Sequence, residues 1–148
     1  MPIAHSTAAA TWSGDLTAGG GTVRPGSGAF PELPISWGRR TQREPGATSP
    51  EELIATAHAA CFSMAFSNEL AKLGHAPERV DVSASVAFET GRADGAAITS
   101  VELVVRARVP GMDDSAFQVA AEAARAGCPV SKALAGVEIR LQAALESG

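Results

Sequence analysis

The chain has 148 residues, of which 45% are hydrophobic and 19% are charged, and its net charge at pH 7 is −4. The length suits one domain that can bury a core, and the composition excludes a disordered chain. The negative balance argues against a nucleic-acid-binding surface, which would concentrate lysine and arginine.

The first 46 residues are rich in glycine, proline, serine and threonine and predict a β-meander. Short β-like pieces lie around Thr7–Trp12, Gly21–Arg24 and Ile35–Arg40, and the glycines at 19–21 supply a turn between the first two. Each piece is too short to form a core alone. We therefore expect the meander to rest on a larger element.

The stretch SPEELIATAHAACFSMAF begins a predicted central helix over residues 49–73. Ser49 can cap the helix, Pro50 suits its first position, and Glu52 stands where the carboxylate of a capping box reaches back to the cap. Gly74 supplies the stop. The middle of the helix has almost no polar side, so we expect protein to enclose most of its faces.

The last part of the chain, residues 80–148, predicts a hairpin, helices and a final strand. Alternation of apolar and polar residues indicates the strands, and GRADGA is the hairpin loop. The predicted elements are strands over 80–89 and 101–109, a helix from Asp113 or Asp114 to Gly127, a helical turn in CPVSKAL, and a strand over 137–143. The sum is a single α+β domain over 1–148, with the long helix lying against antiparallel strands.

Two cysteines, Cys61 and Cys128, are candidates for chemistry. Free cysteines are often small buried hydrophobes, and that interpretation stays open for both. Cys128 lies between Gly127 and Pro129, where one helix ends and the next begins, so a helix dipole should lower its pKa. Cys61 has apolar neighbours on its helix, so its pKa should rise unless a cation is brought to it.

Charged residues near the start of the central helix could supply that cation. The segment SWGRRTQR holds Arg39, Arg40 and Arg43. These side chains are either simply solvated, or one of them holds a thiolate or a peroxide oxygen. The pattern of the segment does not decide which arginine would do so.

Of the two glutamates at the start of the central helix, Glu51 is the one that has no capping role. It lies ten residues before Cys61, which is roughly 15 Å along one helix. A single glutamate side chain does not span that distance. Glu51 and Cys61 can share a site if two copies of the helix lie antiparallel, as a symmetric dimer allows.

His58 and Cys61 form an HxxC pair on one helix face, which raises the question of a metal. Zinc requires three or four ligands at suitable spacing. His5, His75 and Cys128 form no recognisable second pair, so a histidine packed at an interface is favoured and no metal is expected. The chain also has no phosphate-binding glycine loop.

Together, SPEELIATAHAACFSMAF and AGCPVSKAL closely resemble the OsmC/Ohr family of thiol peroxidases, and the OsmC branch in particular. The WSGD start, the GGGTV turn and the PGMD segment are similar to that branch as well, so the resemblance covers essentially the whole chain. It implies an intertwined α+β homodimer with two equivalent sites at the subunit interface.

The resemblance also implies an activity: reduction of organic hydroperoxides, and less efficiently of hydrogen peroxide, in oxidative and osmotic stress defence. By the family motifs, Cys61 attacks the peroxide, Cys128 resolves the sulfenic acid, and Glu51 and Arg40 complete the site. No cofactor is implied beyond an external dithiol reductant. The candidates for an apolar substrate pocket are Phe62, Met64 and Phe66.

Other functions are compatible with the same residues. The chain could be a dimer that binds a small apolar ligand without catalysis, or a thiol redox sensor, and an HxxC metal site is a third alternative. The start MPIAHSTAAATW shows no secretory signal, and no apolar run approaches the ~20 residues of a membrane span. We therefore expect a cytoplasmic protein with no membrane partner.

Overall fold

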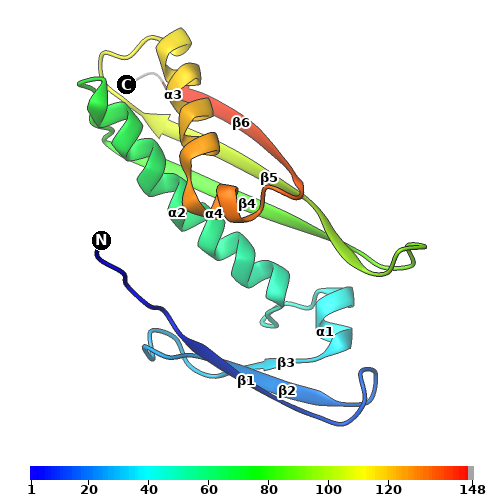
Figure 1. Cartoon of the computed structure of the whole chain (residues 1–148). Helices are drawn as coiled ribbons and strands as arrows, with labels where there is room; N and C mark the ends of the chain where they lie inside the picture. The colour runs from blue at the N-terminus through cyan, green and yellow to red at the C-terminus, as the bar shows by residue number, and fades with distance from the viewer. Residues whose placement is uncertain (147–148) are drawn as a thin grey trace. The chain divides into compact units, whose positions relative to one another are not determined.

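The structure is a computed structural model that describes residues 1–146. The chain divides into two units, Met1–Pro50 and Glu51–Gly148. Each unit contains one three-stranded sheet, and the second also contains a long helix, so the expected α+β class is confirmed (Figure 1). The prediction of one domain over residues 1–148 stays a prediction.

The N-terminal unit is the expected β-meander. Strands β1 (Ala8–Ser13), β2 (Gly20–Pro25) and β3 (Leu33–Ile35) pair antiparallel in the order β1-β2-β3. Strand β2 includes two of the three glycines that were expected to form the turn. At Gly21 a Cβ would collide with the backbone oxygen of Thr11 on the neighbouring strand, so the close pairing of β1 and β2 requires glycine there.

The expected third strand was wrong beyond Ile35, because the chain turns into the short helix α1 (Trp37–Gln42). Ser36 caps this helix: its hydroxyl oxygen accepts a hydrogen bond from the backbone N–H of Arg39 at 3.2 Å. A serine side chain that satisfies a backbone donor competes with the extension of a strand. Strand alternation therefore says nothing about where Arg39 and Arg40 point.

Helix α2 (Pro50–Lys72) matches the predicted central helix to within one residue at each end. Gly74 stops it as expected, with a φ of 81°. The N–H of Gly74 donates to the carbonyl of Ala71, and that of His75 to the carbonyl of Leu70, both at 3.0 Å. Within residues 1–146, neither this helix nor any other is long and apolar enough to cross a membrane.

The second sheet is mixed, which corrects the expectation of antiparallel pairing. Strands β4 (Arg79–Glu89) and β5 (Ala97–Arg108) form the expected antiparallel hairpin. Strand β6 (Glu138–Glu146) pairs with β5 in parallel. Helices α3 (Asp114–Gly127) and α4 (Pro129–Ala133) connect β5 to β6, and such a crossover is what parallel neighbours require.

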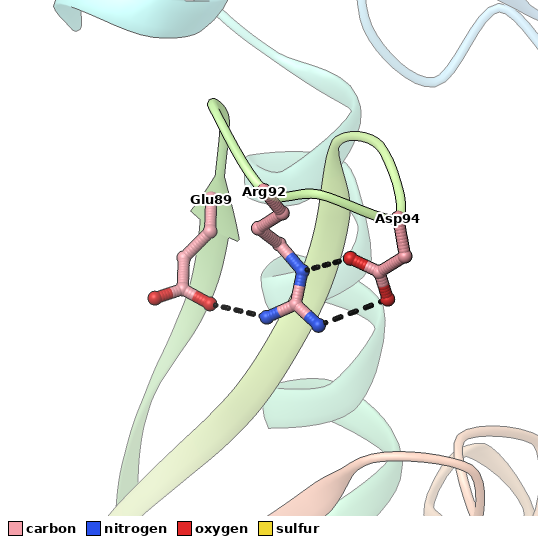
Figure 2. Close-up of polar contacts among 3 residues, drawn as sticks. All are labelled: Glu89, Arg92 and Asp94. Carbon is pink, nitrogen blue, oxygen red and sulfur yellow. Dashed lines mark hydrogen bonds and ion pairs between the residues drawn. The ribbon is translucent and has the colours of Figure 1, made fainter.

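Three charged side chains brace the turn of the β4–β5 hairpin (Figure 2). The Arg92 guanidinium donates to both carboxylate oxygens of Asp94, at 3.0 and 3.1 Å, and to Glu89 at 3.1 Å. These groups are exposed, so water and salt weaken the pairs. Their main effect is to hold the loop in one geometry.

The core of the second unit lies between its helices and its sheet. On α2 the buried positions Phe62, Phe66 and Leu70 recur every four residues and form one stripe. The Phe66 ring meets that of Phe117 on α3 edge-on, with the ring centroids 5.2 Å apart. The core also includes alternate residues of β5: Val101, Leu103, Val105 and Ala107.

Helix α2 is less enclosed by its own chain than the sequence led us to expect. Its other faces are half-buried or exposed, and the Met64 side chain on one of them is 67% exposed. A helix that is apolar on nearly every side normally has protein around most of it. The single chain therefore leaves part of the apolar surface of α2 uncovered.

Candidate active site around two cysteines

Two free thiols meet where the middle of α2 passes the junction of α3 and α4. Cys61 is half-buried on α2, and Cys128 is completely buried. Their side chains lie within hydrogen-bonding reach of each other. Two sulfurs in contact are the basic requirement for a disulfide that forms and breaks without a large rearrangement.

The local sequence explains the position of Cys128. Helix α3 ends at Gly127, and the N–H of Cys128 donates to the carbonyl of Ala124 at 2.8 Å. Pro129 opens α4, and the carbonyl of Cys128 accepts from the N–H of Lys132 at 3.0 Å. Cys128 is thus fixed by one helix on each side.

Cys128 is the more acidic of the two thiols. Burial acts to raise its pKa, but the amide of Ser131, Cys61, the hydroxyl of Ser131 and the amide of Val130 all stabilise the thiolate, and the pKa is lowered. Donors that point at the sulfur favour the charged form over the neutral one, and this lowers the pKa. The direction expected from the sequence is confirmed.

Cys61 is shifted in the opposite direction, also as expected. Burial raises the pKa of its thiol, the Val130 amide opposes that effect, and the hydrogen bond and negative charge of Cys128 raise the pKa further. With only the groups of its own chain around it, Cys61 is therefore mainly a neutral thiol at pH 7. A peroxide-attacking role requires a positive charge, and no cation among the described residues contributes to the pKa shift of this sulfur.

His58 and Ser131 lie beside the cysteines and are completely or nearly completely buried. The ring Nε2 of His58 is 2.8 Å from the Ser131 Oγ. Burial lowers the pKa of His58, so the ring is neutral at pH 7. Its other nitrogen, Nδ1, has no hydrogen-bond partner among the described residues.

The sequence contained a signal for this pair that we did not use. His58 comes three residues before Cys61, and Ser131 comes three residues after Cys128. On a helix such neighbours share a face, so contact between the cysteines brings the other two together as well. The HxxC motif contributes to this polar contact, and residues 1–146 hold no group of three or more histidine, cysteine or acidic side chains arranged for a metal.

Cys61 opens onto a pocket of about 570 Å³ in the second unit. Met64 belongs to its wall, and an ion pair between Lys72 and Glu69, at 2.9 Å, lies on the same wall. The other wall residues are Ala65, Asn68, Ala123, Ala124, Gly127 and Pro129. Of the apolar residues expected around a substrate, Phe62 and Phe66 pack in the core instead, because they share the buried stripe of α2.

Arg40 lies in the N-terminal unit, on the wall of a second pocket of about 350 Å³. Its guanidinium carbon is 5.9 Å from the centre of the Trp37 ring, as in a cation–π contact. The rest of the wall is mostly apolar: Trp12, Leu16, Ile35, Ser36, Trp37, Thr48 and Pro50. Arg40 thus offers a positive charge at one side of an apolar pocket.

Glu51 stands in the first turn of α2, and only 6% of its surface is exposed. Its neighbour Glu52 is exposed. Because Glu51 and Cys61 are ten residues apart on one straight helix, roughly 15 Å separates them along the axis. The fold of the chain therefore brings Cys61 and Cys128 together, but helix α2 does not bring Glu51 to them.

Three comparisons connect this geometry to known proteins. Residues 43–142 match the model of the family described as OsmC-like protein. The chain is 43% identical over 143 residues to peroxiredoxin OsmC of Escherichia coli strain K12, covering 97% of this chain and 98% of that protein.

Solved structures give the same result. The crystal structure of the organic hydroperoxide resistance protein OhrB of Bacillus subtilis is 26% identical, with a TM-score of 0.71, covering 93% of this chain and 98% of that one. An organic hydroperoxide resistance protein OsmC from Legionella pneumophila is 25% identical, with a TM-score of 0.70, covering 96% and 99%.

Proposed function

The chain belongs to the OsmC family, and we propose that it is a cysteine peroxidase that reduces organic hydroperoxides, and less efficiently hydrogen peroxide, in stress defence. The observation that carries the proposal is the pair of free thiols in contact, one of them on the wall of a pocket. The identity to a curated peroxiredoxin over nearly the whole chain supports the same activity.

In the proposed reaction, the Cys61 thiolate attacks one oxygen of the hydroperoxide. An S–O bond forms and the O–O bond breaks, so that an alcohol leaves after taking up a proton and Cys61 becomes a sulfenic acid. The Cys128 sulfur then attacks Cys61, and a disulfide forms while hydroxide leaves and is protonated to water. An external dithiol restores both thiols by exchange, with no other cofactor.

The charge that Cys61 lacks within one subunit would come from Arg40. A guanidinium stays protonated at any working pH and stabilises a thiolate or a peroxide oxygen. We propose that Glu51 orients this arginine, and that the two residues reach Cys61 through a symmetric homodimer. The buried Glu51 at the head of α2 and the uncovered apolar faces of that helix support this arrangement.

The N-terminal sheet also supports a homodimer. Every residue of β1 is exposed and no residue of β2 or β3 is buried, although the strands include Trp12, Val23 and Ile35. A three-stranded sheet without a covered face is unstable in water. A second copy of the chain would cover this sheet.

The apolar pocket beside Arg40 supports an organic substrate. A hydroperoxide group could pair with the guanidinium while its alkyl or aryl part contacts the apolar wall. Bare hydrogen peroxide would gain none of that apolar contact. We place the protein in the cytoplasm, where dithiol reductants are available.

Rapid mixing of the reduced protein with cumene hydroperoxide, and separately with hydrogen peroxide, tests the proposal. We expect faster oxidation by cumene hydroperoxide, by at least about tenfold, because burial of an aromatic group contributes about 1.5–3 kcal/mol. Mass analysis of the product should show a Cys61–Cys128 disulfide. If the thiols oxidise no faster than free cysteine, the peroxidase proposal is wrong, and a ligand-binding or redox-sensing dimer is the better interpretation.

Replacing Arg40 with glutamine should slow the oxidation of Cys61 by about 10²-fold or more, because a charge-assisted contact to the reacting group is lost. Arg39→Gln is the matched control, since Arg39 is equally half-buried on the same helix but lies outside the pocket wall. The measurement is the pH dependence of Cys61 alkylation together with the peroxidase rate. An equal loss in both variants would contradict the assignment to Arg40.

A further inference from the structure

A line of buried polar groups leads from the body of α2 to the Cys128 sulfur. The His58 Nε2 lies 2.8 Å from the Ser131 Oγ, and the Ser131 hydroxyl faces Cys128. The peroxidase chemistry proposed above uses the two sulfurs, Arg40 and Glu51, and it assigns no task to this histidine or this serine.

The unpartnered Nδ1 of His58 indicates whether the ring donates or accepts in its hydrogen bond to Ser131. The ring is neutral, so one nitrogen carries a proton and the other a lone pair. Nδ1 is buried and has no partner in the described part of the chain. Because an orphaned buried N–H is rarer and more costly than an unused acceptor, the proton belongs on Nε2.

With the proton on Nε2, the ring donates to the Ser131 Oγ and occupies one of its lone pairs. The hydroxyl proton of Ser131 is then directed away from the ring and is available to the Cys128 sulfur, with which the hydroxyl makes a hydrogen bond. The opposite tautomer would draw that proton to the ring and leave the sulfur without the donor. The tautomer of His58 thus decides whether its hydrogen-bond partner, the Ser131 hydroxyl, can donate to the Cys128 sulfur.

We propose that His58 and Ser131 are positioning residues for Cys128, linked as Nε2–H to Oγ and O–H to Sγ, which stabilise the thiolate form of the resolving sulfur. A thiolate attacks the sulfenic sulfur of Cys61 directly, forming the S–S bond as hydroxide leaves. The same donors stabilise Cys128 as the leaving group when an external dithiol attacks the Cys61 side of the disulfide. The inference for turnover rests on the proposed function, whereas the inference for thiol ionisation does not.

The ionisable groups that lie near the His58–Ser131–Cys128 chain are a second thiol and two basic side chains. Cys61 faces Cys128 from α2. Arg125 of α3 and Lys132 of α4 share a pocket wall with Ser131, and Arg125 is paired with Glu122 at 2.7 Å. From β6 and the loop before it the wall is apolar, with Ile139 and Val137. The Ser131 hydroxyl is thus a donor to the Cys128 sulfur that a substitution can remove without changing the charge of the site.

The test follows ionisation of Cys128 in a chain whose only cysteine is Cys128, through Cys61→Ala. Alkylation by iodoacetamide across pH gives the midpoint for thiolate formation. We expect Ser131→Ala to raise that midpoint by about one pH unit, which is about tenfold less thiolate at pH 7. His58→Leu should raise it by a smaller amount. Ser131→Thr and His58→Gln, which keep the hydroxyl and the donor, should restore the lower midpoint.

A matched control is Ser63→Ala, which removes a hydroxyl from α2 that donates only to the carbonyl of Ala60. It should leave the midpoint unchanged. Urea unfolding of each variant identifies any that does not fold, and if His58→Leu fails, the Ser131→Ala and Ser131→Thr pair carries the test. Superimposable pH profiles for folded Ser131→Ala and the parent would overturn the proposal.

A second measurement separates this inference from the peroxidase proposal. In the chain with both cysteines, Ser131→Ala should leave oxidation of Cys61 by cumene hydroperoxide unchanged and slow disulfide closure at pH 7 by about tenfold. If Cys61 does not react with the hydroperoxide, the peroxidase proposal fails while the alkylation result still stands. If closure is as fast as in the parent, the positioning role fails.

Discussion

Replacing Cys61 with serine should abolish peroxidase turnover, lowering the rate by about 10³-fold or more. A serine hydroxyl has nearly the same size, but at neutral pH it is neither ionised nor a reductant of peroxides. The half-buried position on α2 tolerates the exchange, so the variant should keep its fold and its unfolding midpoint. The measurement is hydroperoxide consumption in the presence of excess dithiol.

Cys128→Ser is the matched control, because it removes the other sulfur of the same contact. This variant should consume one equivalent of hydroperoxide and then accumulate oxidised Cys61, since no second sulfur closes the disulfide. Mass analysis after one equivalent distinguishes the two variants. Full activity in Cys61→Ser would refute the role assigned to Cys61. A single turnover in Cys61→Ser, and none in Cys128→Ser, would mean that the two cysteines have each other's roles.

Phe66→Ala should lower the free energy of unfolding by about 3–5 kcal/mol. The ring is completely buried, meets Phe117 edge-on with the centroids 5.2 Å apart, and lies 5.7 Å from the centroid of Phe62. Its removal costs both the apolar burial and the aromatic contacts, and the packed helices cannot close the cavity. Urea unfolding at one fixed protein concentration gives the difference.

Val119→Ala on α3 provides the comparison, because this side chain is 69% exposed. Its loss should change the stability by no more than about 0.5 kcal/mol. The concentration is held constant because assembly stabilises an oligomer by mass action. Similar losses in the two variants would mean that the core of the second unit lies elsewhere than between α2, α3 and the sheet.

Much of the fold could be predicted from local patterns. The alternation in β4 and β5 and the stop at Gly74 depend on neighbours in the sequence, and the structure agrees with both. The direction of β6 could not be predicted in this way, because alternation is the same in parallel and antiparallel strands. Helix α1 was missed because a single capping serine, Ser36, outweighed the β-like residues around it.

The site was predictable to a similar extent. The opposite pKa directions of Cys61 and Cys128 follow from an apolar helix face in one case and a helix junction in the other. The contact between His58 and Ser131 depends on a crossing of α2 and α4, segments distant in sequence. His58 and Ser131 each lie three residues from one of the cysteines. This spacing indicates their contact only once it is known that the two sulfurs meet.

The parallel pairing of β6 has a consequence for how a newly made chain matures. This strand follows α3 and α4 in the chain, and it lies beside β5 only after these helices have crossed over the sheet. The segment that holds Cys128 is therefore anchored on both sides only after β6 has been synthesised as well. During translation Cys61 emerges before Cys128, so a nascent chain for a time exposes one of the two contacting sulfurs without the other.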